Sequence, residues 1–300
     1  MKKATKNSAK TIELLFYCGM LALPVIQFLV FYVGVNIRTI TLSFQNYSLS
    51  QNEYSFIWFE NYANVIKDVF SKYVFKRAFF NSFKYYFATL ITSIPLGLLF
   101  SYYIYKKRFL SGMMKVMFFM PSIIGNMVLV ILYQMVVNNV IPYVFDTFPL
   151  LSLLSTKIWG TVFVFNLWIG FGTSVLMYVG AMGIISEGAL EAAKIDGVNS
   201  FQEFIYIILP QIFSTISVFL VTGIAGIFTN QHNIFSFFGK GAEFEHYTVG
   251  YYMYVEIQNA GENYGYVASF GILLTLVVVP VTLLLRKFFN KIDPMADGGM

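Results

Sequence analysis

Long uncharged runs of apolar residues alternate with polar segments along this chain. Six such runs are about as long as the roughly 20 residues that a helix needs to cross the hydrocarbon core of a bilayer, and none contains Asp, Glu, Lys, Arg or His. We predict one membrane-spanning helix for each run. The predicted spans lie at about 14–35, 85–105, 116–137, 158–184, 206–228 and 264–285.

The composition places the whole chain in the same class. Of its 300 residues, 57% are hydrophobic and 12% are charged, whereas soluble domains average roughly 45–50% and 25%. The mean hydropathy of +0.66 excludes a disordered chain, and the single cysteine, Cys18, excludes a disulfide scaffold. We expect an all-α, multi-pass membrane protein that forms one transmembrane domain over residues 1–300.

Basic residues set the expected orientation, because cytoplasmic loops are enriched in Lys and Arg. Several lysines precede the first predicted span, whereas Arg38 alone follows it closely. Two further basic clusters, Lys106–Arg108 and Arg286–Lys287, then fall at inner ends of spans. We predict that both termini are cytoplasmic and that the first run is a retained anchor, too long for a signal peptide. Basic inner loops account for a pI near 9.0, so no nucleic-acid partner is expected.

The third predicted span carries a break signal in its middle. Prolines within the other spans predict simple kinks, which neighbouring helices tolerate by satisfying the freed backbone groups. In the third span, however, Pro121–Ser122 is followed closely by Gly125–Asn126. This combination indicates an interruption of the helix.

The inner segment between the fourth and fifth spans, residues 186–204, differs from every other loop in its density of charge. Ser186 predicts the start of a short helix, and Asp196–Gly197 predicts its end, because glycine readily adopts the left-handed conformation of a helix stop. Ser200 is then expected to cap the helix that leads into the fifth span, with Glu203 completing a capping box.

Two interpretations of this inner segment follow from its residues alone. The pair Ala192–Ala193 gives a small-residue face, flanked by the charges of Glu187, Glu191 and Lys194, that the surface of another protein could approach closely. Such a helix at the inner face of a membrane is suited to docking. The same pattern is equally suited to a solvated connector between two helices.

The segment resembles a known motif. Residues Glu191-Ala192-Ala193-Lys194-Ile195-Asp196-Gly197, with Phe204 and Leu209–Pro210 downstream, match the EAA motif of permease subunits of binding-protein-dependent ABC importers, in its sugar-importer version. The similarity extends over roughly residues 55 to 290, with small departures at Gly188 and Val198. Its further members are Asn61–Tyr62, Asp68, Asn81–Ser82, Met120–Pro121, Ile123–Ile124, Trp168, Gly170–Gly172 and Gly180–Met182.

The resemblance implies a type I ABC importer permease in a bacterial-type cytoplasmic membrane. Two permease subunits, expected to be related but not identical, would form the pore above two ATPase subunits, and an extracytoplasmic binding protein would deliver a sugar, most simply an oligosaccharide. ATP and magnesium are expected on the ATPase, since this chain has no GxxxxGK[ST] loop and is predicted not to be an enzyme. The residues implied to couple the subunits are Glu191, Ala192, Ala193, Asp196 and Gly197.

Candidate solute contacts are uncharged polar and aromatic residues within the spans. The foremost are Asn126, Asn166, Trp168 and Gln211, and the wider set includes Ser174, Ser214 and Ser217. Amides can bond sugar hydroxyls and an indole can stack on a sugar ring. The alternative for each polar residue is a hydrogen bond between helices, which is common in membrane bundles.

Two other functional classes stay open. A secondary carrier or channel working without an ATPase is one, although carriers usually place ionisable groups inside the membrane and these spans have none. A scaffolding or sensing anchor is the other. His232 and His246 lack the tight spacing of metal ligands, so no metal site is predicted, and no residue pattern indicates catalysis.

Overall fold

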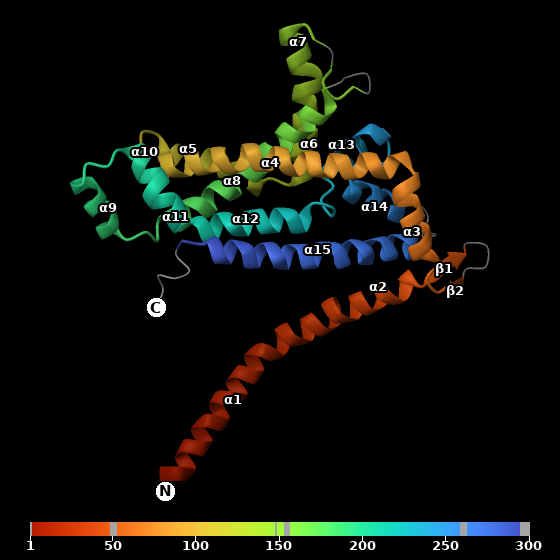
Figure 1. Cartoon of the computed structure of the whole chain (residues 1–300), viewed down its shortest axis with the longest axis horizontal. Helices are drawn as coiled ribbons and strands as arrows, with labels where there is room; N and C mark the ends of the chain where they lie inside the picture. Colours follow the sequence, from red (N-terminus) through yellow and green to blue (C-terminus); the bar gives the residue numbers. More distant parts are fainter. Residues whose placement is uncertain (1, 49–52, 148, 153–156, 259–262, 295–300) are drawn as a thin grey trace. The chain divides into compact units, whose positions relative to one another are not determined.

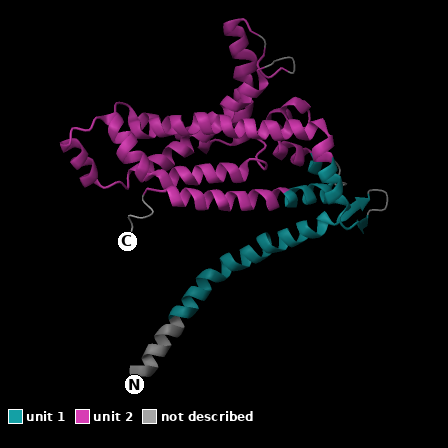
Figure 2. Ribbon diagram, in the orientation of Figure 1, with its two compact units in different colours: residues 1–67, 256–273 teal, residues 68–255, 274–300 magenta. Residues whose placement is uncertain are grey.

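A computed structural model describes residues 2–48, 53–147, 149–152, 157–258 and 263–294, with only the main chain described for residues 2–12 (Figure 1). The described chain is mostly helical. Its contacts divide it into two compact units, residues 1–67 with 256–273 and residues 68–255 with 274–300 (Figure 2). Each unit is described by itself.

The first unit begins with a long helical stretch. Helix α1 (Lys2–Gln27), the π-helical η1 (Phe28–Gly34) and α2 (Val35–Ser43) follow without a break. Within this stretch Glu13–Ser43 is long and apolar enough to cross a membrane, and no residue of its most hydrophobic window is buried within the chain. The predicted first span thus coincides with a helical stretch of spanning length, which continues to Ser43. A fully exposed apolar helix of this kind is suited to lipid or to a partner chain.

A small antiparallel hairpin follows, which the all-α expectation did not include. Strand β1 (Gln45–Ser48) pairs with β2 (Glu53–Phe56), and Gln45 lies opposite Phe56. Helix α3 (Glu60–Ser71) begins just afterward. The strands are only four residues each, which is too short for a strong alternating pattern in the sequence.

Buried polar contacts hold the first unit together. The amide of Asn61 donates to the carbonyl oxygens of Ser43 and Gln45 at 3.0 and 2.9 Å. The hydroxyls of Ser43 and Tyr62 lie 2.7 Å apart. Gly265, near the start of α15 (Tyr264–Ile292), lies so close to the carbonyl of Gln45 that a Cβ there would overlap it. The side chains of Asn61 and Tyr62 thus hold the end of α2 next to the start of the hairpin.

The second unit contains a closely packed core of three helices. Helices α4 (Tyr73–Tyr105) and α5 (Ser111–Ile123) both pack against α8 (Ile158–Met182). The Ser101 hydroxyl donates across to the Val175 carbonyl at 3.1 Å. Gly172 of α8 faces the carbonyl of Phe118 on α5 so closely that any Cβ would overlap it. Small residues let membrane helices approach at backbone distance, and this contact uses one.

The third predicted span, 116–137, is wrong as a continuous helix. Helix α5 ends at Ile123, and the backbone is extended at Ile124 before α6 (Asn126–Met135) begins. The π-helical η2 (Val136–Val140) and α7 (Ile141–Phe145) continue α6, and together 126–145 make a stretch long enough to cross a membrane. Figure 1 shows α6 and α7 leaving the direction of α5. The break lies where Pro121 and Gly125 indicated it.

The fifth predicted span is bent. A first part, made of α10 (Ser200–Gln202), η3 (Glu203–Ile208) and α11 (Leu209–Gln211), meets α12 (Phe213–Gly226) at an angle of 65°. The described residues therefore contain five helices long and apolar enough to span a membrane, or six if this bent pair is one span. The predicted number of about six holds on that count. The outer segment that follows carries α13 (Ile234–Phe238), η4 (Phe244–His246) and α14 (Val249–Gln258).

The backbone contact at Gly172 generates a prediction. Gly172→Ala forces α5 and α8 apart and should lower stability by about 2 kcal/mol, the usual size of an overpacking defect. Thermal unfolding in detergent, followed by size-exclusion chromatography, measures the change. Gly170→Ala is the matched control, because a Cβ at Gly170 meets nothing within 4 Å. Equal stability of the two variants would contradict the contact.

Candidate functional site

The inner segment forms the short helix that the sequence predicted. Helix α9 (Glu187–Ile195) begins after Ser186, whose hydroxyl accepts a hydrogen bond from the Ala189 amide at 3.4 Å. Glu187 in the first turn and Lys194 in the last turn both complement the helix dipole. Gly197 has a φ of +75°, so the helix stops in the left-handed conformation that favours glycine.

The second cap lies one residue earlier than predicted. Asn199, rather than Ser200, accepts hydrogen bonds from the amides of Phe201 and Gln202 at 3.0 and 2.9 Å. Gln202, rather than Glu203, returns the bond by accepting from the Asn199 amide at 3.0 Å. Both patterns satisfy the capping-box rule, and the structure selects the one that leaves Glu203 free for another partner.

Helix α9 has one face turned to its own chain and one face exposed. Ala193 is buried, and Leu190 packs on an apolar cluster at the inner ends of the spans. Ala192 is exposed, so the two alanines do not share one docking face. The exposed face instead carries Glu191, Ala192 and Ile195, and Ile195 is 87% exposed. The apolar cluster consists of Leu98, Tyr178, Met182, Ile185, Phe204, Ile208 and Ile212.

Ile195 is a candidate docking residue that sequence reasoning missed. It lies four positions after Glu191 and three after Ala192, which places all three on one side of a helix. A large apolar side chain so exposed at the end of a polar helix is suited to a pocket on a partner protein. The helical spacing was the available signal.

Polar contacts tie the end of this segment to α4. Glu203 is buried at 5% exposure and forms an ion pair with Lys106. The hydroxyl of Tyr102 donates to the carbonyl of Ser200 at 2.9 Å, and its ring lies 5.0 Å from that of Phe204. Lys106 belongs to the basic cluster that sequence reasoning assigned to the membrane surface. In the structure it compensates a buried carboxylate, which would otherwise carry a large desolvation penalty.

Two of the candidate solute residues meet in one hydrogen-bond chain. The Asn126 amide donates to the side chain of Asn233 at 2.7 Å, and Asn233 donates to the side chain of Asn166 at 2.8 Å. Asn166 in turn donates to the carbonyls of His232 and Val162, each at 2.8 Å. His232 and Asn233 both have positive φ, at 49° and 59°. The amides of Asn126 and Asn166 therefore stabilise a strained turn through hydrogen bonds within the protein, which is the alternative to a solute contact.

The other two candidates lie outside this chain of amides. Trp168 is 44% exposed on α8 and contacts Phe165 edge-on. Gln211 is half-buried at the end of α11, next to the bend. Trp168 and Asn126 are thus the two of the four that are exposed, and Asn126 is already bonded to Asn233. No described hydrogen bond joins either residue to Asn126 or Asn166.

Two open cavities, each lined by both hydroxyls and apolar side chains, lie within the second unit. One of about 200 Å³ lies between α4, α8 and α12, and its lining includes Tyr86, Ser93, Ser174 and Tyr178. Another of about 350 Å³ lies along α12 and the end of α15. Its polar lining is Ser214, Ser217, Thr222, Arg286 and Asn290. The sequence named Ser174, Ser214 and Ser217, but only the packing of separate helices shows which hydroxyls face a cavity.

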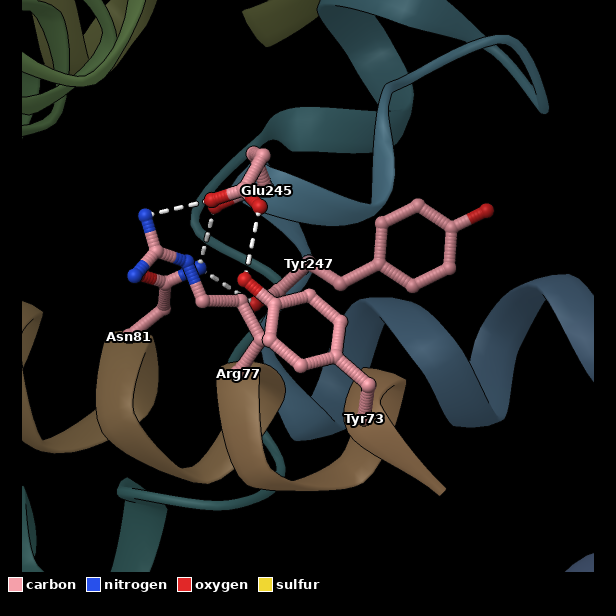
Figure 3. A network of polar contacts seen from close by, with 5 residues as sticks. All are labelled: Tyr73, Arg77, Asn81, Glu245 and Tyr247. Carbon is pink, nitrogen blue, oxygen red and sulfur yellow. Dashed lines mark hydrogen bonds and ion pairs between the residues drawn. The ribbon is translucent and has the colours of Figure 1, made fainter.

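The outer end of α4 holds the outer segment through a second polar network (Figure 3). Arg77 pairs with Glu245 at 2.5 Å, and the Tyr73 hydroxyl donates to the same carboxylate at 2.8 Å. The amide of Asn81 donates to the carbonyls of Glu245 and Tyr247 at 2.7 and 2.9 Å. The ion pair is well exposed and contributes little, whereas Asn81 is buried and matters more. We call these five residues the outer clamp.

His232 lies in a buried aromatic site next to the strained turn. Its ring stacks on Tyr85 with centroids 4.4 Å apart and planes 12° from parallel. Burial lowers the pKa of His232 to about 4, so the ring is neutral at neutral pH. Burial also lowers the pKa of His246, and the nearby carboxylates of Glu243 and Glu245 partly oppose that shift.

Comparison with solved structures identifies the fold. The chain superimposes with a TM-score of 0.78 on a bacterial ABC transporter involved in the import of the acidic polysaccharide alginate, at 20% identity, covering 96% of this chain and 99% of the other. A second structure, of the alginate ABC transporter in complex with an alginate pentasaccharide-bound periplasmic protein, gives a TM-score of 0.76. The fold is therefore that of an ABC importer permease, a multi-pass membrane protein.

The family follows from residues 93–294. This stretch matches the family described as binding-protein-dependent transport system inner membrane component, and the chain belongs to that family. It is 23% identical to the multiple sugar-binding transport system permease protein MsmF of Streptococcus mutans, over 91% of this chain and 94% of that protein. It is 25% identical to the arabinooligosaccharides transport system permease protein AraP of Bacillus subtilis, over 88% and 85%.

The buried His232 generates a prediction about pH. Its pKa in the folded state is below the ordinary value of 6.5, so the unfolded chain binds the proton first and stability falls as pH drops from 6.5 toward 4. We expect a loss on the order of 1–2 kcal/mol between pH 6.5 and pH 5. His232→Phe keeps a stacking ring but cannot titrate.

The measurement is thermal unfolding in detergent at several pH values. His232→Phe should be less stable than the natural chain at neutral pH, because a bulky residue is strained at a positive φ. Its stability should nevertheless vary less between pH 6.5 and pH 5. An unchanged pH dependence would show that His232 is not the group that titrates.

Proposed function

We propose that this chain is one pore subunit of an ATP-driven importer that moves an oligosaccharide from an extracytoplasmic binding protein into the cytoplasm. Its membership of the binding-protein-dependent family supports the transport role. Its relatives include permeases named for multiple sugars, for arabinooligosaccharides and for galactooligosaccharides. These names support short sugar chains as the substrate class proposed here.

The observation that carries the coupling role is the geometry of α9. This helix is capped at both ends, anchored by Leu190 and Ala193 on its inner side, and exposed at Glu191, Ala192 and Ile195 on the other. A rigid helix with one apolar residue in a charged surround is suited to insertion into a cleft on an ATPase. In this proposal Asp196 and Gly197 set the direction in which the helix leaves the membrane face.

The remaining subunits follow from the same proposal. A second, related permease completes the pore, two ATPase subunits bind ATP and magnesium, and this chain has no catalytic role. Both termini then lie in the cytoplasm, as the basic inner clusters indicate. Within the pore, Trp168 and the hydroxyls of the two cavities are the groups proposed to contact the sugar. Protein hydroxyls can bond to sugar hydroxyls, and an indole can stack on the apolar face of a sugar ring.

A carrier or channel that works without an ATPase is the competing function. The two are separated by purification in a mild detergent after expression with the neighbouring genes. In the proposed function an ATPase co-purifies with the chain. Uptake into proteoliposomes then requires ATP inside the vesicles, on the side that the ATPase faces. Uptake by the chain alone, without nucleotide, would establish the competing function.

Gly197 provides the direct test of coupling. Gly197→Val places a β-branched residue at a φ of +75°, which strains the turn after α9 and should turn the docking face away from its partner. We expect oligosaccharide uptake to fall at least about tenfold, a loss within the usual range of coupling free energies. The amount of protein in the membrane should not change, because a Cβ at Gly197 meets nothing within 4 Å.

The matched control is Gly239→Val in the outer segment. Gly239 also ends a helix at a positive φ, and a Cβ there also meets nothing within 4 Å. The control therefore also places a β-branched residue at a positive φ, away from α9, and should keep most of the uptake. If both variants lose uptake equally, strain rather than docking explains the loss, and the coupling role of Gly197 fails.

A further inference from the structure

The inner segment has two routes by which a displacement of α9 could reach the membrane. The first follows the chain through η3 and α11 to α12. That route contains a π-helical stretch at Glu203–Ile208 and a 65° bend at Ile212. Wide helical turns and sharp bends are places where a helix yields. The first route is therefore suited to bending rather than to carrying a push.

The second route leaves the chain sideways, directly to α4. The Tyr102 hydroxyl holds the carbonyl of Ser200 at 2.9 Å, and Lys106 holds the carboxylate of Glu203. The side chain of Glu203 is 6% exposed and that of Lys106 is 21% exposed. An ion pair so shielded from water is screened far less by salt than a surface pair. Removing one partner leaves the other charge buried and uncompensated, which strongly destabilises the contact.

Helix α4 is well built to receive such a push. It is the longest helix of the second unit, with 33 residues and a length of about 50 Å at 1.5 Å per residue. Its inner end holds Tyr102 and Lys106, and its outer end holds Arg77 and Asn81 of the outer clamp. One helix thus contacts both the docking segment and the outer segment at residues 245–247.

We propose, on the basis of the proposed function, that Glu203 and Lys106 are positioning residues that carry the displacement of α9 to α4, and through α4 to the outer clamp. Tyr102 adds a hydrogen bond that keeps the start of α10 in register with the same helix. Neither charged residue contacts solute or nucleotide in this proposal. Their task is to make α9 and α4 move together.

Charge exchange tests the pair. Lys106→Glu leaves two carboxylates facing each other, and Glu203→Lys leaves two cations. The double variant Lys106→Glu/Glu203→Lys restores an ion pair of opposite polarity. Lys107→Glu is the matched control, because it makes the same change of charge in the same basic cluster at an exposed position.

The measurements use the assembled importer in proteoliposomes, with its partner permease, ATPase and binding protein. Uptake of tritium-labelled maltotriose, arabinotriose and galactotriose is measured beside ATP hydrolysis, with the sugar that the natural importer accumulates as the probe. We expect each single variant to keep its ATPase and to hydrolyse ATP, but to transport about tenfold less sugar per ATP. The double variant should recover a ratio of sugar to ATP within about threefold of that of the natural importer. Lys107→Glu should have the same ratio as the natural importer.

A fall in sugar per ATP that is restored by charge exchange supports the proposal, because a merely structural role would lower the amount of assembled importer instead. An unchanged ratio in both single variants overturns it, as does a double variant no better than the single ones. Where charge reversal prevents assembly, Glu203→Gln keeps the side-chain shape and should lower the ratio alone. A natural importer without ATP-dependent uptake would instead contradict the proposed function.

Discussion

A bilayer offers no water to polar groups, so the polar residues of this chain must find partners within the protein or at the membrane surface. Helix α4 shows the consequence most clearly. At its inner end Lys106 neutralises the buried Glu203, at its outer end Asn81 satisfies two backbone carbonyls, and between them Ser101 bonds to α8. The second unit depends on these contacts, because apolar side chains alone pack no better against one another than against lipid.

Close backbone contacts supplement the polar ones. Gly172 brings α8 against α5, and Gly223 brings α12 against the ring of Tyr86 on α4. Gly223 and Tyr86 also belong to the lining of the cavity between α4, α8 and α12. Helix α9 lies at one end of the same group of helices, with Leu190 packed on its apolar cluster and Ala193 buried. A movement of α9 therefore acts on a well-packed body rather than on a loose loop.

Sequence reasoning located the helices better than it located their ends and neighbours. Apolar run length located most of the spans, because the thickness of the bilayer sets that length. It misplaced the third span, since the run 116–137 is uncharged throughout and hydropathy does not register the change of direction at Gly125, which only Pro121 and Gly125 indicated. The hairpin at Gln45–Phe56 was missed, because strands of four residues leave almost no periodic signal. The N-cap of α10 was predicted one residue too late, because Asn199 and Ser200 are both good capping residues and the sequence alone does not choose between them.

The sequence by itself determined the class of protein, the approximate number of spans and the short inner helix that stops before Gly197, because these depend on local composition and on short-range backbone preferences. Only the tertiary structure decided which polar residues are committed to one another. Asn126 and Asn166 read as free amides in the sequence, yet Asn233 joins them in the fold. Glu203 and Lys106 are 97 positions apart, and no local pattern relates them. Their pairing follows from the packing of two helices, where burial makes an uncompensated charge too costly to leave alone.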